Sequence, residues 1–213
     1  MVQMDNQYAF LKPHARTLLI IPLLYLLGYF LARHSGFVFA YQYAISVVAS
    51  ILASFMFDRE IISSNRLLGK NFPDFNRISL FVYPVLLAAA LILVSKYVAR
   101  APVYYLHFSS MDGMPRAELF VLMIVVIVPA TEMLFRGYLQ HVMMHIFGNV
   151  SGSVTAGLAY AGFFLVLSRN IWLLLTAAAI GGLLSFLYYR HQSVLSTIIA
   201  HGILVLALFI FRF

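Results

Sequence analysis

The chain has 213 residues, of which 63% are hydrophobic and 10% are Asp, Glu, Lys or Arg, whereas a soluble domain has about 25% charged residues. This composition, with a mean hydropathy of +0.93, excludes a soluble enzyme, a disordered chain and a collagen-like chain, and it indicates an all-α, polytopic integral membrane protein. The net charge of +7 comes from basic residues scattered at the ends of apolar runs, which predicts contact with the lipid bilayer and no binding of nucleic acid.

Continuous apolar runs predict about seven membrane helices that form a single membrane domain over residues 1–213. The runs are rich in Leu, Ile and Ala, and they lack the alternation of a transmembrane β-barrel. The first run has no cleavage site of small residues, so we expect a helix there and not a signal peptide. In chain order the runs lie at 17–32, 38–57, 78–99, 117–146, 151–168, 171–188 and 193–211.

Small residues spaced four apart predict faces on which these helices pack closely. The loop between the third and fourth runs is expected at 100–116, where prolines and Asp112-Gly113 interrupt the apolar pattern. The small residues are Ser46, Ser50 and Ser54, then Gly157 with Ala161, and Ala178 with Gly182.

The run at 117–146 contains two charged residues, Glu132 and Arg136. Because they are four residues apart, they share one helix face and can form an ion pair. Ionisable side chains are costly inside a membrane, so this pair marks a candidate functional site. A structural ion pair near a helix end is compatible with the same spacing.

The sequence around this pair resembles the first motif of the CPBP family, the CAAX-protease and bacteriocin-processing (Abi) intramembrane proteases. The family pattern is Glu-Glu-x-x-x-Arg, then Phe-x-x-x-His on the next helix, and His-x-x-x-Asn or Asp near the C-terminus. The resemblance covers residues 117–211, and a Tyr-Tyr-Arg-x-x-Ser segment precedes the third motif, whereas residues 1–116 carry no motif. The corresponding residues are Thr131, Glu132 and Arg136, then Phe164 and Ser168, and finally His201 and Val205.

The resemblance implies a CAAX-protease-like helical core, in which the first glutamate and the second-motif histidine activate water and the third motif stabilises the oxyanion. This chain keeps Glu132, Arg136, Phe164 and His201 but differs at the other three positions. Threonine is not a general base near neutral pH, and valine has no hydrogen-bond donor. The sequence therefore predicts a degenerate member, a pseudoprotease that binds a membrane protein or a lipidated peptide. The degenerate positions are Thr131, Ser168 and Val205.

Two other functions are compatible with these residues. An active intramembrane CAAX-type endopeptidase with a remodelled site could use a Ser–His dyad, with Ser168 or Thr131 as nucleophile and His201 as base. A structural helical subunit of a transporter, energy-transducing or secretion complex would need no catalytic residue. For all three we expect no cofactor and a location in a bacterial cytoplasmic membrane.

His141 and His145 have the spacing of two zinc ligands on one helix face, but the sequence between them lacks the Glu of a His-Glu-x-x-His motif. A third ligand would have to come from His201 or Glu132. Because both histidines lie where the helix leaves its apolar segment, solvation at the membrane surface explains them, and we expect no metal.

The motif positions of the family surround one site, so the resemblance predicts that the matching side chains converge in one cavity. These are Thr131, Glu132, Arg136, Ser168, His201 and Val205.

Overall fold

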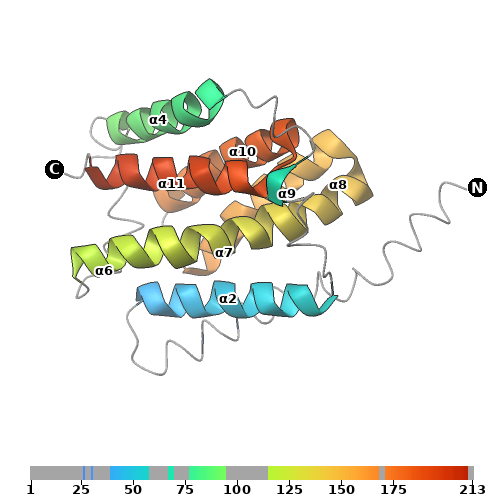
Figure 1. Cartoon of the computed structure of the whole chain (residues 1–213), viewed down its shortest axis with the longest axis horizontal. Helices are drawn as coiled ribbons and strands as arrows, with labels where there is room; N and C mark the ends of the chain where they lie inside the picture. Colours follow the sequence, from blue (N-terminus) through green and yellow to red (C-terminus); the bar gives the residue numbers. More distant parts are fainter. Residues whose placement is uncertain are drawn as a thin grey trace, which may run out of the picture.

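The computed structural model is all-helical over the residues that it describes, which are 26, 30, 39–57, 67–69, 77–94, 115–167 and 171–210 (Figure 1). No strand occurs in these ranges, as the all-α prediction requires. The helices are α2 (Phe39–Phe57), α4 (Arg77–Val94), a long helix from Arg116 to Phe147, α9 (Asn149–Leu167), α10 (Ile171–His191) and α11 (Val194–Ile210).

Six of the predicted apolar runs are therefore helices in the structure. The run at 17–32 and the loop at 100–116 lie outside the described residues, apart from Leu26, Phe30, Pro115 and Arg116, so the count of about seven spans remains a prediction. Within the described ranges, Ala117–Phe147 is the helix that is long and apolar enough to cross a membrane, with 31 residues and an 18-residue stretch of mean hydropathy 2.2. Leu80–Val94 and Val194–Ile210 are shorter apolar helices.

The long helix contains two π-helical segments. It runs through α6 (Arg116–Val121), η4 (Leu122–Ile127), α7 (Val128–Glu132), η5 (Met133–Gln140) and α8 (His141–Phe147), where η4 and η5 are π-helical. Pro129 is the second residue of α7, just after η4, and cannot donate a backbone hydrogen bond, so the wider turn relieves the clash that a proline ring makes inside an α-helix. The helix therefore continues past the proline as one rod.

The long helix lies at the centre of the bundle (Figure 1). α2 packs on it along η4, α7 and η5, and α11 contacts it at α7 and η5 from the other side. α10 packs against α9 and α11, and α4 covers α11 and α10. Most core residues of these helices form one large cluster, which includes Leu134, Phe135 and Leu204.

The distribution of side chains is that of a protein in a bilayer. Large apolar side chains cover the outside: Leu52, Val125 and Leu158 are 61%, 64% and 63% exposed. Polar groups lie inside, where Ser46, Glu132 and Gln140 are fully buried. Water does not favour such a surface, whereas a lipid environment does.

Two of the three small-residue faces predicted from the sequence, the serines of α2 and Gly157 with Ala161 on α9, are packing faces, whereas Gly182 of the third is exposed and a Cβ there would meet nothing within 4 Å. Ser46, Ser50 and Ser54 are all fully buried on α2, and the hydroxyls of Ser50 and Ser54 donate to the carbonyls four residues earlier. α9 and α10 approach so closely at Gly157 and Gly181 that a Cβ on Gly181 would lie 2.7 Å from the Gly157 carbonyl oxygen.

Local caps set the start of the helices that carry the site. Gly148, with φ of +81°, ends α8 and lets the chain turn into α9. Ser193 begins α11: its hydroxyl accepts a hydrogen bond from the backbone N–H of Ser196 at 3.3 Å and donates to the Leu67 carbonyl at 2.9 Å.

Candidate functional site

Three charged or titratable side chains meet in the interior of the bundle. Oε1 of Glu132, on α7, lies 2.7 Å from Nδ1 of His201, on α11. Oε2 of Glu132 lies 3.4 Å from Nε of Arg136 in η5. Glu132, Arg136 and His201 are 0%, 1% and 4% exposed, so the predicted ion pair is a buried one and includes a histidine from a distant helix.

Arg136 is held by two further contacts. Its second guanidinium nitrogen, Nη2, donates to the carbonyl oxygen of Gly181 on α10 at 3.0 Å. The guanidinium carbon lies 4.8 Å from the ring centroid of Tyr160 on α9, within the range of a cation–π contact. Tyr160 in turn packs edge-on against Phe135. Arg136 therefore joins η5 to both α9 and α10.

Gln140 makes a second polar crosslink one turn further along η5. Its amide nitrogen donates to the Ser153 hydroxyl at 3.0 Å and to the Ser185 carbonyl at 2.9 Å. The Ser153 hydroxyl donates to the Asn149 carbonyl at 2.7 Å. Glu132, Arg136 and Gln140 thus form one polar face, and π-helical segments such as η5 frequently occur at functional sites.

Several buried polar atoms of this face have no hydrogen-bond partner within the described part of the chain. They include the Thr131 hydroxyl, Nη1 of Arg136 and the amide oxygen of Gln140. A buried polar group without a partner costs about 1–3 kcal/mol. The cluster is consequently under-satisfied, which is more typical of a functional site than of a core optimised for stability.

The structure places the remaining motif positions as follows. Thr131 is fully buried on α7 beside Glu132, and Val205 is 4% exposed on α11, one turn after His201. Ser168 lies outside the described residues, as does the side chain of Phe164. Glu132, Arg136 and His201 are joined by direct contacts, whereas convergence of all six residues in one cavity remains a prediction.

His141 and His145 interact with each other. Their ring centroids are 4.4 Å apart, and Nδ1 of His145 lies 3.0 Å from the His141 carbonyl oxygen. His201 and Glu132, the proposed third ligands, are instead paired in the interior. In the described ranges no three His, Cys, Asp or Glu side chains are grouped as a metal site would require.

Sequence reasoning overlooked Gln140, Tyr160 and Ser185. Gln140 had a local signal, because it follows Glu132 and Arg136 at the same four-residue spacing. Tyr160 and Ser185 lie on other helices and resemble ordinary membrane residues, so only the packing of α9 and α10 against η5 shows their part in the site.

The described residues form a helical bundle with an apolar surface, one helix of membrane-spanning length and a buried Glu–Arg–His cluster. Residues 115–207 match the family model described as type II CAAX prenyl endopeptidase Rce1-like. This match bears out the CPBP resemblance over these residues, and the Rce1-like family is membrane-embedded. The matched segment contains every motif position named above. Neither the curated proteins nor the solved structures compared with the chain gave a match.

Proposed function

We propose that this CPBP-fold protein is a catalytically degenerate pseudoprotease of a bacterial cytoplasmic membrane. It binds a membrane protein or a lipidated peptide and does not cleave it. The observation that carries this proposal is that the Glu132 carboxylate is fully buried, with Oε1 2.7 Å from Nδ1 of His201 and Oε2 in a 3.4 Å ion pair with Nε of Arg136.

A general base must reach the proton that it removes, directly or through one water. Glu132 is buried beside His201 and Arg136, and the neighbouring position that would carry the family's first glutamate holds Thr131. A positioned general base contributes about 10²–10⁴-fold to the rate. The loss of this carboxylate therefore removes a large part of the rate acceleration of peptide hydrolysis.

The oxyanion side of the family site is also altered. Val205 is buried one turn after His201, where the family has an amide or carboxyl side chain. Loss of one oxyanion donor lowers kcat by about 10²–10³-fold. Because the general base and the oxyanion donor are both changed, we infer that the retained Glu132–Arg136–His201 cluster maintains the structure of the site and not its catalytic turnover.

One observation favours a second candidate, an active endopeptidase with a remodelled site. Because a carboxylate only accepts hydrogen bonds, His201 donates to Glu132 through Nδ1 at 2.7 Å. This orientation leaves Nε2 as the proton acceptor of a neutral ring, which is how a carboxylate prepares a histidine as a general base.

The two candidates differ in turnover by the purified full-length protein. In detergent, we expect no cleavage of prenylated CAAX reporter peptides, while an active CAAX protease processes the same peptides. A fluorescent prenylated peptide should nevertheless bind, with saturable anisotropy. Cleavage by the wild type that His201→Ala abolishes would overturn the pseudoprotease proposal in favour of the active enzyme. If the protein neither binds nor cleaves these peptides, the proposal that it binds lipidated peptides is wrong.

A further inference from the structure

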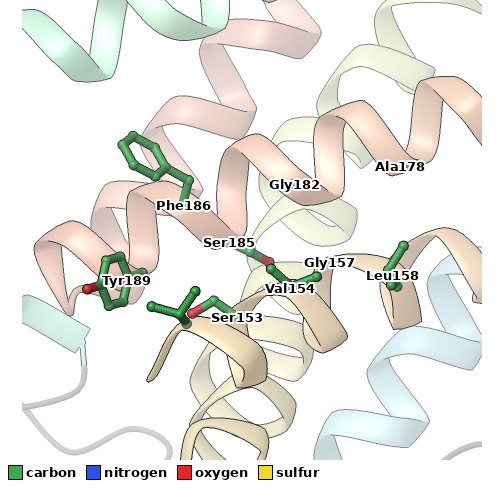
Figure 2. Close-up of a pocket in the computed structure, with 10 residues that line it drawn as sticks. Ser153, Val154, Gly157, Leu158, Ala178, Gly182, Ser185, Phe186 and Tyr189 are labelled. Atoms are coloured by element: carbon green, nitrogen blue, oxygen red, sulfur yellow. The ribbon is translucent and has the colours of Figure 1, made fainter. Parts of the chain in front are cut away.

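A groove runs between α9 and α10 on the outside of the bundle (Figure 2). Its volume is about 300 Å³, and its lining is almost wholly apolar. Val154 on α9 and Phe186 on α10 form opposite walls, and the lining includes Ser153 on α9 and Ser185 on α10 (Figure 2). Binding sites for small ligands typically start at about 300 Å³ and combine an apolar lining with a few placed polar groups.

Two glycines give the groove its shape. Gly157 allows α9 to approach α10, because a Cβ there would lie 3.4 Å from the backbone of Gly181 and Gly182. Gly182 faces open space, since a Cβ added to it would meet nothing within 4 Å. The missing side chain at Gly182 therefore keeps the groove open, although tight packing between the helices does not require a glycine at that position.

The polar group in the groove is the Ser185 hydroxyl. Ser185 is 2% exposed, and its oxygen has no hydrogen-bond partner within the described ranges. Several hydroxyls in other parts of the bundle donate to a carbonyl three or four residues earlier, as Ser50 on α2, Ser153 on α9 and Thr197 on α11 do.

Two carbonyls near Ser185 accept hydrogen bonds from the buried cluster. The oxygen of Gly181, four residues earlier, accepts the 3.0 Å hydrogen bond from Arg136. The carbonyl of Ser185 itself accepts from Gln140. The Ser185 hydroxyl, which has no hydrogen-bond partner within the described ranges, can therefore donate to an acceptor in the groove.

The surroundings of the groove indicate what supplies this acceptor. Val150, Val154 and Leu158 on its α9 rim are 64%, 59% and 63% exposed, so the groove opens onto the apolar surface that faces lipid. Tyr189, which also lines it, and the exposed Arg190 end α10, and such residues mark the level of the lipid head groups. Ser185 lies five residues before Arg190, about 7.5 Å deeper along the helix axis.

We propose that this groove is a phospholipid site. One acyl chain lies between α9 and α10 over Gly182, its ester carbonyl accepts a hydrogen bond from Ser185, and the phosphate lies towards Arg190. A guanidinium pairs well with a phosphate, so the charge at this end of the groove suits the head group. The inference rests on the membrane location and is independent of whether the protein cleaves or binds peptides.

The test uses the full chain in vesicles of phosphatidylcholine and phosphatidylglycerol with a trace of phospholipid that carries a diazirine in one acyl chain. After irradiation, peptide mass spectrometry locates the label. We expect labelling concentrated at residues 153–158 and 178–186, above that of other exposed apolar faces such as Leu52 on α2.

Two variants and one matched control decide the result. Gly182→Leu fills the groove and should lower this labelling about tenfold, which corresponds to about 1.4 kcal/mol. Ser185→Ala keeps the space, so it should fold, and it should lower labelling about fivefold through loss of one hydrogen bond. Gly162→Leu is the control, because a Cβ there also meets nothing within 4 Å but lies outside the groove.

Even labelling of all lipid-facing helices, unchanged in Gly182→Leu, would show surface lipid only and overturn the site. A second copy of the chain is the other possible occupant, and the absence of native cysteine allows a direct check. Disulfide-linked dimers of Leu158→Cys in the vesicles would assign the groove to that copy and also overturn the proposal.

Discussion

Arg136 is expected to be necessary for stability only while Glu132 carries its charge. Arg136→Met keeps a side chain of similar length but removes the 3.4 Å ion pair and the 3.0 Å hydrogen bond to the Gly181 carbonyl. Glu132, which is fully buried, then retains His201 as its partner but loses the compensating cation. Glu132→Gln does the reverse and keeps a hydrogen-bonding side chain for His201.

The magnitude follows from the burial of both side chains, which are 0% and 1% exposed. Breaking a buried pair by removal of one charge costs about 3–5 kcal/mol, so each single variant should lose that much. The double variant leaves no buried charge on either residue and loses one hydrogen bond to Gly181, about 1 kcal/mol. The double variant should therefore be more stable than either single variant.

The measurement is reversible unfolding of the four proteins in mixed micelles, followed by far-ultraviolet circular dichroism. Arg190→Met is the matched control, because Arg190 is exposed at the end of α10 and should change stability by less than about 1 kcal/mol. If the effects of the two single variants add to within about 0.5 kcal/mol in the double variant, the two charges do not interact and the reasoning fails.

Three further predictions concern packing, the second polar crosslink and the lost activity. Gly181→Ala should cost about 1–3 kcal/mol, because its Cβ would lie 2.7 Å from the Gly157 carbonyl oxygen, whereas Gly182→Ala should be nearly neutral; comparison of their melting temperatures checks this. Gln140→Leu should lower unfolding free energy by about 1–3 kcal/mol through loss of the hydrogen bonds to Ser153 and Ser185, and equal stability to the wild type would show that this crosslink is unimportant. A triple variant that restores the family pattern should cleave prenylated reporter peptides if it folds, and no single change should suffice, since such groups act as a unit. The three changes are Thr131→Glu, Ser168→His and Val205→Asn.

The sequence alone determined the features that depend on local pattern. Long apolar runs with few charges predict helices for a membrane, and six of these runs are helices within one or a few residues of the expected ends. The four-residue spacing of Glu132 and Arg136 predicts their shared face, because neighbours along a helix follow from its pitch. The motifs predicted the Rce1-like match at residues 115–207.

Only the tertiary structure decided which distant groups complete the site. His201 lies 69 residues from Glu132, and the Gly181 carbonyl lies 45 residues from Arg136; both contacts depend on how α10 and α11 pack against the long helix. Helical periodicity gives the faces of one helix but not the partner, register or rotation of another. For the same reason, the sequence alone does not predict that Arg136 donates to the Gly181 carbonyl. It also does not predict that the Ser185 hydroxyl lacks a hydrogen-bond partner within the described residues.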